Sequence, residues 1–160
     1  MSSNLNILIL GDAGVGKTSF ITMKNRDKFI RDYIPTMGVE NTNILYKNIT
    51  FNISEFAGQE KFGFKKYLGN LNPDAIILMF DCASNISYKN IQYWYDAISV
   101  KHIPIILIGN KCDSKYIKYD GPKNIYHFEK QNLKYFNVST QNNININEVF
   151  DYLYTILNTN

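Results

Sequence analysis

Three short runs of apolar residues constrain the fold of this chain more than any other feature. They are "NILIL" (6–10), "AIILMF" (75–80) and "IPIILIG" (103–109). Each run is apolar on both faces of an extended chain, which is typical of a strand buried within a parallel sheet. All three are far too short to cross a bilayer. The chain is therefore expected to build its core around a parallel sheet.

A fourth strand, residues 49–54, alternates apolar and polar side chains and is expected to be half-buried. The alternation places three apolar residues on one face: Ile49, Phe51 and Ile53. Residues 41–46 precede this strand across Lys47 and Asn48. A two-residue connection between two extended segments predicts a β-hairpin.

Apolar residues between and after these strands recur at helical spacing. One pattern comprises Ile91, Trp94, Tyr95 and Ile98, and another comprises Ile146, Val149, Phe150, Leu153, Ile156 and Leu157. Asn145 or Asn147 is expected to cap the second helix. Strands that alternate with helices predict an α/β fold, a doubly wound sheet with one antiparallel edge strand. Ligands of such sheets bind beyond the carboxyl ends of the strands.

Composition places few further limits on function. The length of 160 residues suits one domain, which we assign to residues 1–160. The net charge of +3 is too small to argue for nucleic acid or an anionic membrane as a partner. Cys82 and Cys112 are expected to be small packing residues in a reducing compartment. The first residues lack a signal-peptide pattern and "YTILNTN" holds no cysteine, so we expect neither secretion nor a lipid anchor.

The segment "GDAGVGKT" (11–18) follows the first strand and opens a helix, and it matches the phosphate-loop pattern. Gly11 and Gly16 permit turns that other residues resist. Backbone N–H groups then converge on phosphate at the helix N-terminus. Lys17 is expected to reach the β- and γ-phosphates, and the Thr18 hydroxyl to bind magnesium. The residues of this loop expected to contact the nucleotide are Asp12, Ala13, Gly14, Val15, Gly16, Lys17, Thr18 and Ser19.

The segment "NKCD" (110–113) follows the strand at 103–109 and suits recognition of guanine. The Asp113 carboxylate accepts two hydrogen bonds from the N1–H and 2-amino groups of guanine, whereas adenine would leave it unpaired. Asn110 is expected to bond N7 and tie this loop to the phosphate loop. The aliphatic stem of Lys111 would cover one face of the base. Four residues alone are a weak signal, but their place after a strand in a chain with a phosphate loop makes them a strong one.

These motifs, in this order, resemble those of the Ras superfamily of small GTPases. Within it, the chain is most similar to the Ran group of nuclear-transport GTPases. The stretches that carry this similarity are "YIPTMGVE", "GQEKFG", "IILMFD", "SYKNI", "IPIILIGNKCD" and "NLKYFNVS". The resemblance spans about Leu5 to Leu157. It implies the phosphate-loop small-GTPase fold, a six-stranded, mostly parallel sheet with one antiparallel edge strand and helices on both faces.

The resemblance also implies roles for residues that pattern alone would not single out. Gln59 would orient the attacking water and, with Lys17, forms the expected catalytic pair. The segment "VSTQ" (138–141) matches the loop whose middle N–H, here that of Thr140, meets guanine O6. Further residues expected at the nucleotide are Phe29, Tyr33, Thr36, Gly58, Ser139 and Gln141. The expected magnesium ligands are Thr18, Thr36 and, through a water molecule, Glu55.

The chain departs from the resembled pattern at several positions. Glu55 stands where aspartate is usual, so magnesium binding is expected to be weakened but not lost. Phe56 replaces a threonine and is expected either to pack inward or to cover the switch. Ala13 replaces a glycine near the path of an arginine finger. The basic run of the Ran group is here "HFEKQ", and the sequence ends at Asn160 without the acidic tail of that group.

The leading hypothesis is a slow GTP-hydrolysing switch with Mg²⁺ as cofactor and GTP or GDP as ligand. A binding module with little turnover is the main alternative, and a nucleotide kinase is a poor one because the chain has only Arg26 and Arg31. A Rab-like trafficking role is the alternative to a Ran-like transport role. Expected partners are an exchange factor, an activating protein and effectors, including importin-type receptors. Nucleic acid and a lipid anchor are not expected. We expect a monomer in the cytoplasm or nucleus.

Overall fold

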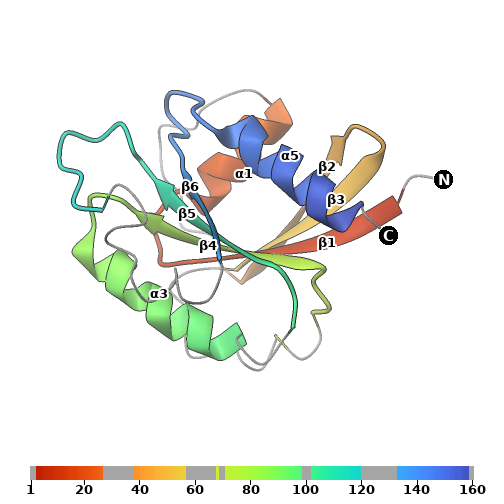
Figure 1. Ribbon diagram of the computed structural model, residues 1–160, viewed down its shortest axis with the longest axis horizontal. Coiled ribbons are helices and arrows are strands. Elements are labelled where there is room, and N and C mark those ends of the chain that lie inside the picture. The colour runs from red at the N-terminus through yellow and green to blue at the C-terminus, as the bar shows by residue number, and fades with distance from the viewer. Residues whose placement is uncertain are drawn as a thin grey trace.

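A computed structural model of the chain describes residues 3–26, 38–56, 68, 71–98, 102–119 and 133–158. The strands in this part of the chain are β1 (Ser3–Leu10), β2 (Val39–Tyr46), β3 (Ile49–Phe56), β4 (Ala75–Asp81), β5 (Ile105–Asn110) and β6 (Lys134–Asn137). The helices are α1 (Lys17–Arg26), α3 (Asn85–Ile98) and α5 (Ile146–Leu157). Figure 1 shows these elements in place.

The six described strands form one sheet in the order β2-β3-β1-β4-β5-β6. β2 and β3 pair antiparallel, and every other neighbouring pair is parallel. The predicted hairpin at Lys47 and Asn48 is confirmed, with Lys47 in the left-handed region at a φ of 55°. The predicted α/β sheet with one antiparallel edge strand is therefore confirmed. The short strand β6 carries no strong apolar pattern, and its place in the sheet was implied only by the family resemblance.

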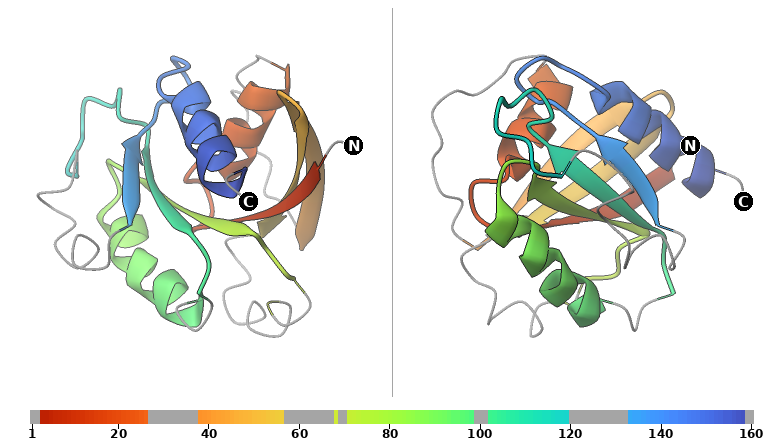
Figure 2. Two further views of the ribbon diagram at one scale, coloured as in Figure 1. Left: turned by 45° about the vertical axis from the view of Figure 1, so that its right-hand side comes forward. Right: turned by 60° about the vertical axis from the view of Figure 1, so that its left-hand side comes forward.

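β4, β5 and the second half of β1 (7–10) are buried on both faces because helices cover both sides of the sheet (Figure 2). α1 and α5 lie on one face, where Phe20 stacks on Phe150 with ring centroids 5.6 Å apart. α3 lies on the other face and packs Ile91, Trp94 and Ile98 against the sheet. In β1, successive residues contribute to opposite core clusters, as the alternation of side chains along a strand requires.

The two helical patterns predicted from the sequence are confirmed, but the predicted cap of the second helix is wrong in one respect. Asn145 occupies the N-cap position of α5, yet its side chain makes no capping hydrogen bond. Its Nδ2 atom instead donates to the carbonyl of Asn137 at 2.7 Å. Asn145 has a left-handed backbone, with a φ of 58°, so it turns the chain from β6 into α5. Its amide therefore ties the end of the sheet to the start of the helix.

The far end of the β2–β3 hairpin is joined to α5 by polar contacts. Asp151 Oδ1 accepts a hydrogen bond from the Tyr46 hydroxyl at 2.6 Å and one from Lys47 Nζ at 2.8 Å. The Tyr154 hydroxyl donates to Asn48 Oδ1 at 2.8 Å. We call these contacts the hairpin anchor. They fix the antiparallel edge of the sheet to the last helix.

The structure also bears on Cys82 and Phe56, for which packing inside the protein was expected. Cys82 and Phe56 are fully buried in the cluster beneath α3, so Phe56 packs inward. Cys112 is half-buried and His102 is exposed just before β5. None of the described helices has the length and apolarity needed to cross a bilayer.

Candidate functional site

The phosphate loop joins β1 to α1 at the carboxyl edge of the sheet. In Figure 1 this edge lies at the left, away from the two chain termini. α1 begins at Lys17, and the amide of Phe20 donates to the Gly16 carbonyl at 2.9 Å. The amides at the start of a helix have no acceptor within it, so they are available to an anion. The predicted strand–loop–helix context of the motif is thus confirmed.

The two glycines singled out in the phosphate loop are required by close approach to neighbouring strands. Gly11 has a φ of 152°, and a Cβ atom there would lie 2.2 Å from the carbonyl oxygen of Met79 in β4. Gly16 has a φ of 102°, and its Cβ would lie 2.2 Å from Asn110 Nδ2 in β5. Both positions combine a left-handed backbone with the absence of space for a side chain. The loop is therefore shaped by β4 and β5 as well as by its own sequence.

Lys17 is held inside the phosphate loop as a buried cation. Its ammonium group donates to the carbonyls of Gly11 at 2.8 Å and Asp12 at 2.9 Å. Burial lowers the pKa of Lys17 to about 8, although the charges of Glu55 and Asp12 act in the opposite direction. A phosphate group beside this ammonium would favour its charged form. The geometry thus presents one cation to an anion bound in the loop.

Thr18 and Glu55 meet directly at the end of β3. The Thr18 hydroxyl donates to Glu55 Oε1 at 2.5 Å, and Glu55 is only 4% exposed. Burial raises the pKa of Glu55, while the Thr18 hydrogen bond and the charge of Lys17 lower it by less. The extra methylene of glutamate therefore brings the carboxylate into contact with a hydroxyl that was predicted to bind a metal.

Within the described ranges, no three His, Cys, Asp or Glu side chains come together as a metal-binding group. The oxygens of Thr18 and Glu55 are nevertheless of the type that Mg²⁺ prefers. A buried carboxylate with a raised pKa would also gain from a nearby cation. These residues fit Mg²⁺ if the 2.5 Å contact between them opens. The proposed water-mediated role of Glu55 stays a prediction.

Asn110 connects the guanine motif to the phosphate loop, as predicted. Its Nδ2 atom donates to the Val15 carbonyl at 2.9 Å. Its Oδ1 atom accepts from the backbone N–H of Thr140 at 3.3 Å. One fully buried amide thus joins three loops at the edge of the sheet. The Thr140 N–H assigned to guanine O6 is engaged with Asn110 in this structure.

Lys111 extends across the site from the end of β5 to the phosphate loop. Its ammonium group donates to the Gly14 carbonyl at 2.9 Å and pairs with Asp81 Oδ2 at 2.8 Å. Both ends of the side chain are fixed, so its aliphatic stem can form a wall beside a bound base. Asp81 was not singled out in the sequence. Its position at the carboxyl end of β4, level with Asn110 in the register, was the available signal.

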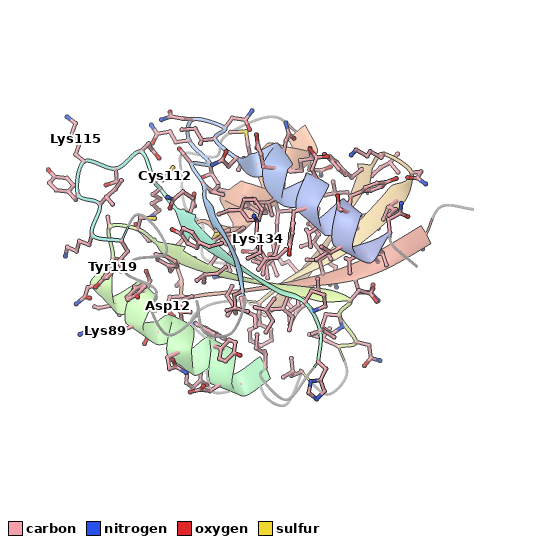
Figure 3. The ribbon with its side chains drawn as sticks, viewed as in Figure 1. Asp12, Lys89, Cys112, Lys115, Tyr119 and Lys134 are labelled. Carbon is pink, nitrogen blue, oxygen red and sulfur yellow. The ribbon has the colours of Figure 1, made fainter. Side chains whose placement is uncertain are left out.

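The other predicted residues of the guanine loops lie at the same edge. Asp113 is exposed, two residues beyond Lys111. Ser139 is fully buried, and its hydroxyl accepts from the amide of Asn142 at 3.0 Å, which shapes the loop after β6. Gln141 is exposed. Figure 3 labels Cys112 and Lys115 in the neighbouring loop that follows β5.

The side chain of Asp12 is hydrogen-bonded to Asn90 and Trp94 of α3, and Figure 3 labels Asp12 beside this helix. It was predicted only as part of the loop, and its contacts with α3 were not foreseen. Ala13 is exposed, while Val15 is buried and Ser19 is half-buried. Five further predicted residues lie outside the described part of the chain: Phe29, Tyr33, Thr36, Gly58 and Gln59.

A comparison with protein-family models agrees with this geometry. The model described as the Ras family matches residues 6–159. The chain belongs to the Ras family. It is thus a small GTPase by family, and Ras-family proteins bind GTP and GDP, typically with Mg²⁺. Such proteins generally interact with exchange factors, activating proteins and effectors.

Proposed function

We propose that this Ras-family chain is a guanine-nucleotide switch that hydrolyses GTP slowly, in a Ran-like transport role. The observation that carries the nucleotide part is the link through Asn110, which bonds the Val15 carbonyl of the phosphate loop and the Thr140 amide of the guanine loop. This link supports a phosphate site and a base site that lie together at one edge of the sheet. A nucleotide is the ligand class that carries both groups.

Guanine is favoured over adenine by the donors and acceptors at the base site. Asp113 supplies a carboxylate, and Lys111 is fixed between Gly14 and Asp81 as a wall for the base. Lys17 supplies the cation for the phosphates, and the backbone amides from Ala13 to Thr18 supply the donors. Mg²⁺, when bound, would neutralise negative charge on the phosphates. The Thr18 and Glu55 oxygens are the described groups that would hold it.

The slow rate is proposed from the contact between Thr18 and Glu55. A hydroxyl committed to a buried carboxylate at 2.5 Å must be released before it can serve a metal ion. Unassisted hydrolysis by Ras is known to run at about 10⁻⁴ to 10⁻³ s⁻¹. We expect this chain to run at or below that range. The same contact supports the second candidate, a GTP- or GDP-binding module with little turnover.

Single-turnover hydrolysis of labelled GTP across a magnesium titration tests the proposal. The parent is expected to turn over slowly, and Gln59→Leu to lower the rate further with GTP affinity retained. The matched control is Gln92→Leu, the same change at an exposed position of α3. Equal rates for the parent and Gln59→Leu would refute the role of Gln59. Binding without measurable turnover in the parent at saturating magnesium would support the binding module instead.

The Ran-like part is supported by resemblance over "IILMFD", "SYKNI", "IPIILIGNKCD" and "NLKYFNVS". A pull-down with the GTP-locked and GDP-loaded forms against importin-type receptors tests it. Retention of a receptor by the GTP form alone is the expected result. Binding of Rab-type effectors by the GTP form, without receptor binding, would favour a trafficking role.

A further inference from the structure

Asp12, the residue after Gly11 in the phosphate loop, is hydrogen-bonded to helix α3. Asp12 Oδ2 accepts a hydrogen bond from Asn90 Nδ2 at 2.5 Å, and Asp12 Oδ1 accepts one from Trp94 Nε1 at 3.0 Å. Asn90 and Trp94 are four residues apart and therefore lie on one face of α3. Figure 3 labels Asp12 close to this helix. Both carboxylate oxygens are thus held by donors from α3.

The backbone of Asp12 is held at the same time from inside the loop. Its carbonyl accepts from Lys17 Nζ at 2.9 Å. The side-chain and main-chain contacts together hold Asp12 in place near the start of the phosphate loop. Beyond it, Ala13 is exposed, and the Gly14 carbonyl accepts a hydrogen bond from Lys111 Nζ at 2.9 Å. The shape of the loop here depends on its anchored residues.

Trp94 is well placed to be a rigid donor. It is fully buried among the residues between α3 and the sheet and packs edge-on against Tyr93, with ring centroids 5.5 Å apart. An indole N–H is a donor only, and a carboxylate without its proton is an acceptor only. Hydrogen bonds to a charged group are stronger than those between neutral groups. The α3 face therefore holds the charged carboxylate in one orientation.

We propose that Asp12 is a positioning residue, held by Asn90 and Trp94, that keeps the phosphate loop in its anion-accepting shape before nucleotide binds. In this arrangement α3 is a structural part of the nucleotide site, because its side chains hold the loop through Asp12. The proposal rests on the proposed nucleotide-binding function. It predicts that a change on α3 alters the exchange of loop amides and the rate of nucleotide release.

The test is Asn90→Asp, which places a second carboxylate against Asp12 with almost no change in size. We expect GDP release about tenfold faster than in the parent, within the range of coupling known for residues in direct contact. Amides 13–18 should exchange with deuterium faster in the ligand-free protein. The matched control, Gln92→Glu, adds the same charge at an exposed position of the same helix and should change neither quantity.

The reciprocal variant Asp12→Asn with Asn90→Asp separates positioning from general damage to the fold. It restores one amide opposite one carboxylate, so loop-amide exchange and GDP release should return toward the parent values. A double variant no better than Asn90→Asp alone would overturn the proposal. So would an Asn90→Asp variant with parental amide exchange and parental GDP release.

The sole tryptophan of the chain gives a signal that does not depend on nucleotide. Asn90→Asp should shift the emission of Trp94 in the ligand-free protein, because the carboxylate at its N–H changes position, and the double variant should reverse the shift. An unshifted emission would count against the proposal. If GDP does not bind at all, the proposed nucleotide function fails. The role of Asp12 is then still decided by loop-amide exchange and Trp94 emission, with inorganic pyrophosphate as the anion whose binding to the loop is measured.

Discussion

Replacing Glu55 with aspartate should strengthen magnesium binding. The longer glutamate reaches the Thr18 hydroxyl and accepts its hydrogen bond at 2.5 Å. Aspartate is shorter by one methylene, which leaves room for a water molecule between the carboxylate and the hydroxyl. We therefore expect Glu55→Asp to bind Mg²⁺ more tightly in the nucleotide complex and to hydrolyse GTP at the parental rate or faster.

The size of this effect follows from the geometry of the contact. Glu55 is expected to reach Mg²⁺ through a water molecule, so its direct 2.5 Å contact with the Thr18 hydroxyl must open before Thr18 can bind the ion. A hydrogen bond to a charged group contributes about 1.5–3 kcal/mol. In the parent, breaking the hydrogen bond between Thr18 and Glu55 at the lower of these values weakens magnesium binding by about tenfold. Glu55→Asp, which lacks this bond, is therefore expected to bind Mg²⁺ about tenfold more tightly.

The assay is the rate of GDP release as a function of free magnesium, followed with a fluorescent GDP analogue. The matched control is Glu40→Asp, the same chemical change in an exposed residue that pairs with Glu55 across β2 and β3. Its magnesium dependence should equal that of the parent. If Glu55→Asp binds magnesium no more tightly than the parent, the Thr18 contact does not limit the metal. If Glu55→Asp abolishes hydrolysis, Glu55 has a role that aspartate cannot fill.

Glu55→Gln should separate the metal effect from the stability effect. Burial raises the pKa of Glu55, so the folded chain favours the protonated carboxyl more than the unfolded chain does. The stability contributed by this group is complete below the unfolded value of 4.5 and is lost as the pH rises through the higher folded pKa. At neutral pH and in a chelator, Glu55→Gln should therefore raise the free energy of unfolding, while weakening magnesium binding. A lowered unfolding free energy in urea titrations would contradict this account.

Three further predictions concern the nucleotide site. The pKa of Lys17 is about 8 without ligand, and a bound phosphate favours its charged form, so GDP binding should take up a proton above pH 8. Calorimetry in buffers of different ionisation enthalpy would measure this proton uptake. Asp113→Asn should shift preference from guanine toward xanthine nucleotides in competition assays, and equal competition by ATP and GTP in the parent would refute base selection. Gly16→Ala should lower the free energy of unfolding by about 2 kcal/mol or more, because the added methyl group collides with Asn110. Gly14→Ala should lower it by about 1–2 kcal/mol, because the methyl group there meets no neighbour and adds backbone strain alone.

The sequence predicted the fold well where hydrophobic patterns are strong. The residues of β4 and β5 are apolar on both faces, and only a sheet covered on both sides explains such runs. The four residues of β6 carry no comparable pattern, because tyrosine, lysine and asparagine interrupt it and no side chain of the strand is fully buried. Its edge position in the sheet explains why its sequence is less constrained.

The candidate site was predicted as a set of motifs but not as a set of contacts. The link from Asn110 to the phosphate loop was foreseen from the guanine motif and its place after a buried strand. The bonds from Asn90 and Trp94 to Asp12 depend on how α3 lies across the sheet, and local sequence does not encode that placement. The contact between Thr18 and Glu55 depends on a difference of one methylene in reach. The pattern identified the substitution at Glu55, and only the structure showed which oxygen it touches.

The hairpin anchor limits how β2, at the edge of the sheet, can move when the candidate nucleotide site changes. Sliding β2 by one residue along β3 would turn the buried Ile44 outward and the exposed Leu45 inward. It would also displace the Tyr46 hydroxyl from Asp151 on α5. Register slippage is therefore opposed at the distal end of the hairpin by both burial and polar contacts. A rearrangement that begins near Gly38 must be absorbed by local bending at that end of β2, with the strand pairing beyond it unchanged.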